Sequence, residues 1–494
     1  MAYQENGLDP SDWQGFRQQA HAMLDDMLDF TEQTRARPVW REAPPASRAA
    51  IQGEPLPTEP MALSAIHQTF KDHILPFSAG NTHPGFMGWV QGGGTAVGML
   101  AEMLAAGLNA NLGGRNQMPI LVERQITEWM KTLFGFPGSA SGLFVTGTSM
   151  ANLMAVLIAR NAALGHGVRQ DGLGGDQPRL TAYTSRASHG CVAQAMDLSG
   201  QGQTWLRRIG TNARHEIQLD ELRQAIEQDR RAGLHPFLIV GTAGSVDTGS
   251  IDDLAALAQL AREQGMWFHV DGAFGALGML SPQIAPRLRG LDRADSIAFD
   301  FHKWGQVPYD AGFLLVRDGT LHHDTFAAPA AYLRRETQGI SAGDFWPCDY
   351  GPDLSRGFRA LKTWFTLKAF GTQGLGQAIH HTCELAQYLR ERVEQTPELE
   401  LLAPVALNIV CLRHRGHSAM SEAQRDAFNA DIVTAVQLSG LAAPSSTTVD
   451  GRFAIRAAIV NHRTRRQDID TLVQAVLAQG ARLLSATATQ EVAR

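Results

Sequence analysis

The sequence has few cysteines, no long apolar run and no excess of positive charge. Its four cysteines are spread over 494 residues without a CxxC pair, too few to staple the chain, so we expect a reducing, cytoplasmic compartment. No stretch of 18 or more apolar residues occurs, and residues 1–16 lack the apolar core of a signal peptide, so we expect no membrane partner. With 43 basic against 49 acidic side chains the net charge is −6, so we expect no nucleic-acid partner.

Signature motifs of several enzyme classes are also missing. There is no HExxH pair, and the 17 histidines are scattered, so we expect no metal site. The chain contains no GxSxG nucleophile elbow and no GxxxxGK[ST] phosphate loop. The glycine turn at 146–149 is not GxGxxG, and no acidic residue follows a strand at the distance that dinucleotide folds require. A nicotinamide dehydrogenase is therefore disfavoured.

The chain does contain short apolar runs that alternate with helical segments. The runs at 236–241 (PFLIVG) and 266–270 (MWFHV) flank a helical pattern that Asp252 can cap and Gly265 can end. Alternation of this kind over residues 84–375 predicts an α/β fold, with a mostly parallel sheet flanked by helices. Ligands of such folds bind beyond the carboxyl ends of the strands, so the residues after each apolar run are the candidates for a site.

The two ends of the chain differ from this central region. Residues 1–83 are helix-like with a proline-rich interruption at 37–60, which predicts an N-terminal helical arm that packs on another subunit, or else a small separate domain. Residues 376–494 hold two amphipathic helical stretches and several short strands. They predict a small α+β C-terminal domain, the alternative being an extension of the central core.

Two residues at predicted strand ends have side chains suited to coenzyme chemistry. Lys303 lies between Phe301 and Trp304, whose rings would exclude water and so favour the neutral amine that a Schiff base requires. Asp271 ends the run 266–270, and a buried carboxylate needs a cationic partner such as a pyridinium nitrogen. Each also has an ordinary interpretation, a surface lysine and a turn-forming aspartate.

A hydroxyl-rich turn and a histidine complete the set of candidates. Residues 143–153 (LFVTGTSMANL) form a strand, a glycine turn and a helix start, and a helix N-terminus with free hydroxyls binds phosphate. The same turn can simply cap the helix. His189 follows the predicted strand at 181–184 and can stack on a planar ring or transfer a proton, although a lone histidine is often structural.

The order of these elements resembles that of the fold-type I pyridoxal-phosphate enzymes over about residues 60–470. More narrowly, the sequence resembles the group II amino-acid decarboxylases, the family that includes aromatic-L-amino-acid decarboxylase. Four motifs carry the resemblance: HVDGAFG at 269–275, DFHKW at 300–304, LSRGFRALKTWFTLKAFG at 354–371 and RFAIRAAIVNHRT at 452–464.

The resemblance implies pyridoxal 5'-phosphate as the cofactor. Lys303 would hold it covalently, Asp271 would pair with its pyridinium nitrogen, and His189 would stack on its ring. The family's usual asparagine is Asp300 here. Because a carboxylate aimed at the phosphate would repel it, we expect Asp300 to face away or to accept a hydrogen bond.

The remaining cofactor residues and the proton donor also follow from the resemblance. Thr148 and Ser149 would bind the phosphate together with His302, and Thr242 would lie near the cofactor. Tyr332 matches the tyrosine of the family's mobile loop, the proposed donor of a proton to the substrate carbon.

The resemblance further implies a homodimer, with the site at the subunit interface and an arm wrapped over the partner. The family's aromatic-rich stretch reads HPGFMGWV at 83–90 here, with smaller residues at 85, 87 and 88 in place of bulkier groups. Within this stretch His83, Phe86 and Trp89 are the predicted substrate contacts. No arginine or lysine occurs at 73–114, which favours an aromatic or large apolar substrate over an acidic one.

We therefore predict decarboxylation of an L-amino acid to the amine and CO₂. The main alternative is another reaction on the same cofactor, either decarboxylative oxidation to an aldehyde or a different lyase reaction. A non-catalytic interaction protein is disfavoured, because no cofactor position is lost.

Overall fold

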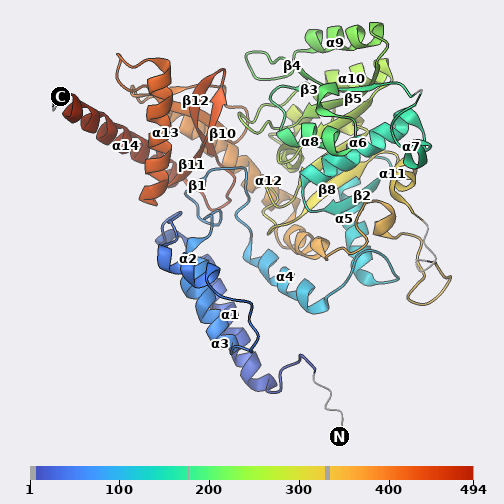
Figure 1. Cartoon of the computed structure of the whole chain (residues 1–494), viewed down its shortest axis with the longest axis horizontal. Helices are drawn as coiled ribbons and strands as arrows, with labels where there is room; N and C mark the ends of the chain where they lie inside the picture. Colours follow the sequence, from blue (N-terminus) through green and yellow to red (C-terminus); the bar gives the residue numbers. More distant parts are fainter. Residues whose placement is uncertain (1–6, 176, 329–333, 493–494) are drawn as a thin grey trace.

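The computed structural model describes residues 7–175, 177–328 and 334–492. Three parts are visible in Figure 1: a helical arm at the N-terminus, a large sheet covered by helices, and a smaller sheet with the C-terminal helices. No helix in the described ranges is both long and apolar enough to cross a membrane.

The large sheet has the strand order β2-β8-β7-β6-β5-β3-β4. Its strands are β2 (Ser141–Val145), β3 (Leu180–Ser185), β4 (Leu206–Ile209), β5 (His235–Thr242), β6 (Trp267–Asp271), β7 (Ser296–Asp300) and β8 (Gly312–Val316). All pair in parallel except β8, which runs antiparallel to both β2 and β7. The predicted α/β fold is confirmed. The central strands are buried on both faces, which is why they appear in the sequence as continuous apolar runs.

Helices pack around this sheet (Figure 1). The helices of the central part of the chain are α4 (Ala96–Leu108), α5 (Met118–Phe134), α6 (Thr148–Leu164), α7 (Val168–Asp171), α8 (Gly190–Leu198), α9 (Leu219–Arg231), α10 (Leu254–Gln264), α11 (Gly319–Phe326) and α12 (Arg359–Glu394). The predicted cap of α10 is wrong by one residue. Asp253 caps the helix by accepting from the Ala256 amide, whereas Asp252 accepts from the backbone amides of Ile217 and Thr242.

The small sheet has the order β1-β11-β12-β10-β9. It is built from β1 (Phe86–Met87), β9 (Leu399–Leu401), β10 (Ile409–His414), β11 (Ala443–Val449) and β12 (Arg452–Ala458), packed against α13 (Glu422–Ser439) and α14 (Arg466–Val492). The short strand β1 pairs in parallel with β11, and α12 runs through position 375. The strand β1 at residues 86–87 therefore belongs to the small sheet, and the domain boundaries at 84 and 376 stay predictions.

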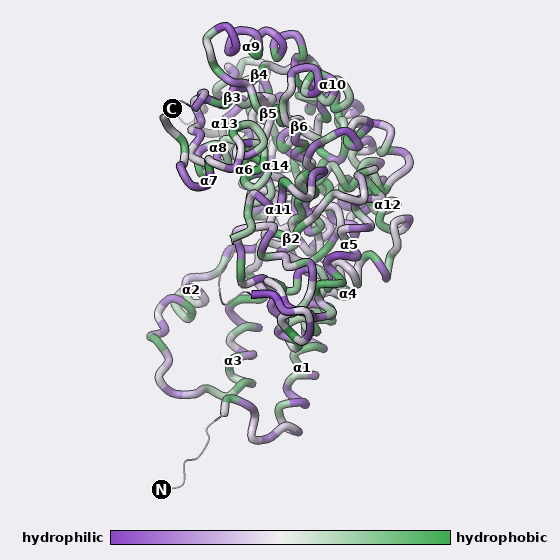
Figure 2. Tube along the Cα trace, turned by 90° about the vertical axis from the view of Figure 1, so that its right-hand side faces the viewer, coloured by the Kyte–Doolittle hydropathy of each residue, from purple (hydrophilic) through white to green (hydrophobic). Residues whose placement is uncertain are grey.

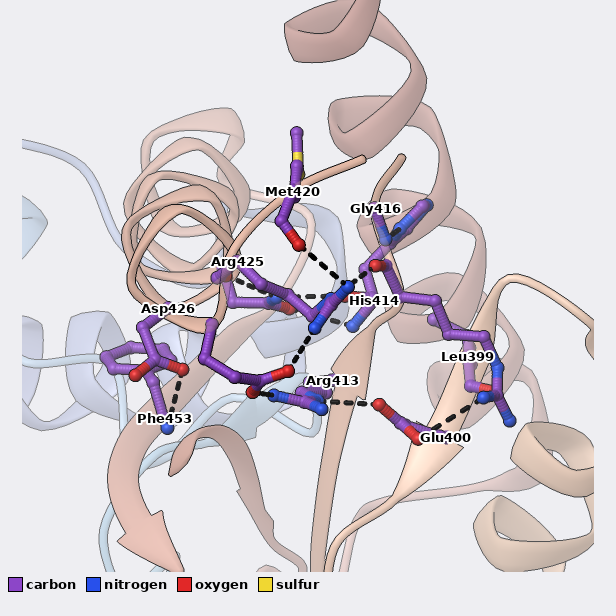
Figure 3. Close-up of polar contacts among 12 residues, drawn as sticks. Leu399, Glu400, Arg413, His414, Gly416, Met420, Arg425, Asp426 and Phe453 are labelled. Carbon is purple, nitrogen blue, oxygen red and sulfur yellow. Dashed lines mark hydrogen bonds and ion pairs between the residues drawn. The ribbon is translucent and has the colours of Figure 1, made fainter. Parts of the chain in front are cut away.

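A buried arginine ties α13 to the small sheet (Figure 3). Arg413 on β10 donates to Glu400 on β9 at 2.6 Å and to Glu422 on α13 at 2.8 Å. Glu422 also pairs with Arg425, which donates to the carbonyl of Arg415 at 2.7 Å. Hydrogen bonds to charged groups are among the stronger ones, so this cluster fixes the helix against two strands.

The N-terminal arm projects from the body of the molecule (Figures 1 and 2). It contains α1 (Trp13–Glu32), α2 (Pro45–Gln52) and α3 (Leu63–Thr69). The helix α2 lies inside the proline-rich interruption at 37–60, with proline at its first helical position, where the missing N–H costs nothing. The twenty-residue helix α1 buries none of its residues.

Candidate active site

A cavity of about 410 Å³ lies at the carboxyl ends of β5, β6 and β7, beside the N-terminus of α6. This is where ligands bind in open α/β sheets. Its lining includes Trp89, Thr148, Ser149, His189, Thr242, Asp271, Asp300, His302, Lys303, Tyr309 and Arg456. Most of the predicted cofactor residues are thus brought together, although 155 positions separate Thr148 from Lys303 in the chain.

Lys303 follows β7 and enters the cavity with its side chain 22% exposed. Its Nζ lies 2.8 Å from Oδ2 of Asp300. Asp271 ends β6, where its Oδ1 accepts from the Ala273 amide at 3.1 Å and its Oδ2 accepts from Asn152 Nδ2 at 3.2 Å. Burial raises the pKa of Asp271, which is 4% exposed and forms no ion pair with any described side chain. A cationic ligand group would stabilise this carboxylate.

The turn between β2 and α6 forms the second side of the cavity. The amide of Thr148, at the start of α6, donates to Asp300 Oδ1 at 2.8 Å. The Thr148 hydroxyl is buried and has no hydrogen-bond partner. Gly312 allows β8 to pass close behind this turn, because a Cβ there would lie 2.4 Å from the Cα of Gly147. The turn therefore offers a helix N-terminus and a free hydroxyl to an anion.

Asp300 does not face away from the cavity. One carboxylate oxygen accepts the Thr148 amide, and the other contacts Lys303 and lies 3.6 Å from Nε2 of His302. We expected Asp300 either to face away or to accept a hydrogen bond, and the structure shows the second arrangement. A buried carboxylate thus occupies the end of α6, next to the amine.

Two histidines face the cavity in defined orientations. His189 caps α8, and its Nδ1 accepts from the Cys191 amide at 3.1 Å, so a neutral ring carries its proton on Nε2. His302 Nδ1 accepts from the Ala311 amide at 3.0 Å, and its ring lies 4.3 Å from the ring of Tyr309. Burial lowers the pKa of His302.

Thr242 ends β5 beside Asp271, with which it is paired in the sheet. Its amide donates to Asp252 at 2.9 Å, and burial raises the pKa of that carboxyl to about 6. The Thr242 hydroxyl, like that of Thr148, is buried without a partner. The cavity therefore offers two free hydroxyls at a helix N-terminus, a buried carboxylate without a cation, and an amine. These groups fit the phosphate, the pyridinium nitrogen and the aldehyde of pyridoxal phosphate.

The predicted substrate contacts lie in different places. Trp89 lines the cavity and is 58% exposed. Phe86 is buried in β1, with its ring 6.3 Å from that of Trp89, and is not part of the lining. His83 lines a separate cavity of about 270 Å³ between the arm and the body. Tyr332 lies outside the described residues.

Three residues near the cavity were missed by the sequence analysis. Arg456 donates to the carbonyls of Gly88 and Val246, which holds the loops at 89–91 and after β5 against the small sheet. Arg456 could have been found from the sequence, because it is a charged residue inside the apolar run of β12. The ring of Tyr309 packs against that of His302 at a tilt of 36°, and Asn152 contacts Asp271, but nothing in the local sequence distinguishes Tyr309 or Asn152.

Comparisons with known proteins agree with this geometry. A family model described as the pyridoxal-dependent decarboxylase conserved domain matches residues 45–415. The chain belongs to this family. It is 34% identical to an aromatic-L-amino-acid decarboxylase of Bacillus atrophaeus over 392 residues, covering 78% of this chain and 79% of that protein. A phenylacetaldehyde synthase of Petunia hybrida is 28% identical, covering 97% and 96%.

Solved structures show the same fold. The crystal structure of Oryza sativa TDC with PLP and tryptamine has a TM-score of 0.88 at 23% identity, covering 97% of this chain and all of that one. The predicted fold-type I architecture is confirmed, and so is the pyridoxal-phosphate-dependent amino-acid decarboxylase activity of the family. Within the described ranges, no group of His, Cys, Asp and Glu side chains is arranged to hold a metal ion.

Proposed function

We propose that this chain decarboxylates an aromatic L-amino acid to its amine, as a cytoplasmic homodimer. The observation that carries the proposal is the single cavity in which Lys303, Asp271 and the two unpartnered threonine hydroxyls meet. When bound there, the coenzyme supplies an electron sink for the pair released as the carboxylate leaves. The four cysteines are free, which supports the assigned compartment.

Each residue around that site has a separate role in binding the coenzyme. Lys303 Nζ would hold the coenzyme through its aldehyde group. Asp271 would pair with the ring nitrogen and favour its protonated form, and His189 would contact the ring. Thr148 and Ser149 offer hydroxyls to the phosphate at the N-terminus of α6.

An aromatic substrate is supported by the lining of the cavity. Trp89, Val90, Val246 and Phe274 are apolar lining residues, and Lys303 and Arg456 are the lysine and the arginine among the described lining residues. The guanidinium of Arg456 already donates to two backbone carbonyls. Relatives that match most of the chain include a tryptophan decarboxylase of Oryza sativa and tyrosine decarboxylases of Petroselinum crispum.

Aldehyde formation is the second candidate, because phenylacetaldehyde synthases of Petunia hybrida and Arabidopsis thaliana match over more than nine-tenths of the chain. Tyr332 favours the amine, since a phenol aimed at the substrate carbon can donate the required proton. A panel of aromatic amino acids assayed for CO₂, amine, aldehyde and peroxide separates the two reactions. Tyr332→Phe should lower the amine-to-aldehyde ratio under air.

The homodimer is supported by the arm. Helices α1, α3 and α4 enclose an open apolar groove of about 620 Å³, whose lining includes Phe16, Met23, Met27, Ile66, Phe70 and Met103. Figure 2 shows hydrophobic stretches along α1 and α3. Because α1 buries none of its residues in its own chain, a second copy that covers the groove would account for the arm.

Replacing the nucleophile tests the proposed function. Lys303→Ala should abolish the visible absorbance of the covalently held coenzyme and lower turnover by about 10³-fold or more, because the cavity offers no second lysine. The matched control is Lys362→Met, which alters a buried lysine on α12 that pairs with Glu102. Unchanged coenzyme absorbance in Lys303→Ala would overturn the assignment.

A further inference from the structure

A chain of buried polar side chains leads to Asp271 from the far end of β6. Trp267, His269 and Asp271 alternate along this strand, so their side chains share one face of the sheet. Ser296 lies on β7, directly paired with His269, and Asn152 comes from α6, which packs on the sheet here. His269, Ser296 and Asn152 are each at most 1% exposed. None of the three lines the cavity.

The contacts along this chain are all hydrogen bonds. The indole Nε1 of Trp267 donates to Ser296 Oγ at 2.9 Å, and Ser296 Oγ lies 2.8 Å from His269 Nδ1. His269 Nε2 lies 2.7 Å from Asn152 Oδ1, and Asn152 Nδ2 donates to Asp271 Oδ2 at 3.2 Å. Burial lowers the pKa of His269 to about 3, so the ring is neutral and carries a single proton.

The direction of the donors follows from an ionised Asp271. A carboxylate only accepts, so Asn152 must present its N–H to Asp271 and its oxygen to His269. His269 then donates from Nε2 and accepts at Nδ1, where the proton of Ser296 fills the contact. Ser296 Oγ is left to accept from Trp267, whose indole can only donate. In this arrangement every donor meets an acceptor.

The opposite direction has a defect. If Asp271 carried a proton on Oδ2, it would donate to Asn152, the amide would turn over, and His269 would donate from Nδ1 to Ser296. Ser296 Oγ would then accept from both His269 and Trp267, and its own buried proton would have no partner along the chain. An unsatisfied buried donor is costly, so the indole of Trp267 disfavours a proton on Oδ2 and keeps this oxygen an acceptor, as in the ionised carboxylate.

We propose that His269 is a positioning residue which, with Trp267, Ser296 and Asn152, keeps Asp271 charged and thereby keeps the ring nitrogen of the coenzyme protonated. The inference rests on the proposed function, since it assumes that this ring nitrogen faces Asp271. The other titratable groups near the carboxylate are Lys303 and His189 across the cavity and Cys191, whose Sγ lies 3.9 Å away. Burial alone raises the pKa of Asp271, so the carboxylate needs this support.

The test compares two ligands on coenzyme-free protein. One is pyridoxal phosphate, and the other is its 1-deaza analogue, in which a C–H replaces the ring nitrogen and cannot be protonated. His269→Phe should lower the affinity for pyridoxal phosphate by about tenfold, because a hydrogen bond that supports a charge is lost. The affinity for the analogue should stay within about twofold of the wild-type value. His269→Gln, which keeps a donor for Asn152, should restore most of the lost affinity for pyridoxal phosphate.

The matched control is His322→Phe. His322 is also fully buried, and its Nδ1 also contacts a serine, Ser141 Oγ at 2.7 Å, but it lies on α11 away from the cavity. We expect neither ligand to change its affinity in this variant. If His269→Phe does not fold, Trp267→Phe tests the same chain of hydrogen bonds, because the partly exposed indole is its first donor. This variant should lose less affinity for pyridoxal phosphate and should again leave the affinity for the analogue unchanged.

The outcomes are distinguishable. Selective weakening of pyridoxal phosphate supports the inference. An equal loss of affinity for both ligands would show that His269 acts only on packing and would overturn the inference. Unchanged affinity for both ligands would also overturn it, because His269 would then not support the carboxylate. Failure of the wild-type protein to bind pyridoxal phosphate at all would instead refute the proposed function.

Discussion

At the scale of single residues, the unusual group in the site is the Asp300 carboxylate. It accepts the first amide of α6 and holds Lys303 at 2.8 Å, so it occupies the positive end of the helix at which we propose that the phosphate binds. Two anions at one helix end repel each other, and one of them must lose contacts when the other arrives.

We therefore expect Asp300→Asn to tighten the binding of pyridoxal phosphate by about tenfold, the equivalent of about 1.4 kcal/mol. The affinity for inorganic phosphate should rise in the same direction. Pyridoxal without its phosphate is the control ligand, and its affinity should stay within about twofold. Equilibrium titration of coenzyme-free protein measures all three, and an equal gain for pyridoxal would contradict the explanation.

Much of the site could be predicted from residues at strand ends. Thr242, Asp271 and Lys303 follow apolar runs, and parallel strands bring their carboxyl ends to one edge. Arg456 and Tyr309 could not be found this way, because one arrives from the other sheet and the other from an irregular loop.

The predicted aromatic stretch divides for a structural reason. Phe86 pairs with Ala443 in the small sheet, and its side chain is buried there beside Val39. Three positions later, Trp89 faces the cavity. The sequence shows neighbouring aromatic residues but not the turn between them, which depends on a strand far along the chain.

At the scale of elements, strands with apolar composition were easier to predict than polar ones, although the polar segment 181–184 was also predicted and forms part of β3. The runs that became β5, β6 and β8 are almost wholly apolar. By contrast, β4 (LRRI) contains two arginines and β11 (APSSTTV) is mainly small and polar. Their extended form comes from pairing with neighbours, since β propensity depends on context.

The contact between α11 and β2 makes stability depend on pH. His322 is fully buried against Ser141, and burial lowers the pKa of its ring to about 3. The unfolded ring takes up a proton below about pH 6.5 while the folded ring does not, so this histidine favours the folded state above pH 6.5 and favours unfolding as the pH falls toward 3.

Between pH 7 and pH 5 the wild-type free energy of unfolding should therefore fall by about 2 kcal/mol more than that of His322→Phe. Reversible urea unfolding at the two pH values measures the difference. His417→Phe, at an exposed position, should follow the wild type. A variant with the full wild-type pH dependence would show that His322 does not contribute.

At the scale of the whole molecule, the arm leaves much of its apolar surface uncovered by its own chain. In the described structure α1 has no buried residue, and Ile66 and Met103 on the groove are each about half exposed. A monomer with this surface would expose a large apolar patch, which is typical of an interface between subunits.

Charged substitutions in the groove should dissociate the proposed dimer. We expect the pair Ile66→Asp and Met103→Glu to weaken self-association by about 30-fold or more, since it places charges at the centre of an apolar interface. Sedimentation equilibrium measures the change. Leu438→Glu alters an exposed leucine on α13 outside the groove and should keep the wild-type association constant. Unchanged association of the double variant would contradict the assignment of this surface.

The strand β1 also determines when the protein can finish folding during synthesis. Its partner β11 lies near the end of the chain, and Ser445 Oγ donates to the Gly88 carbonyl across 357 positions. At roughly 10 residues per second, a ribosome needs about half a minute to add that length. For that time the segment that leads into Trp89 has no strand to pair with, so the cavity is completed only after β11 has been made.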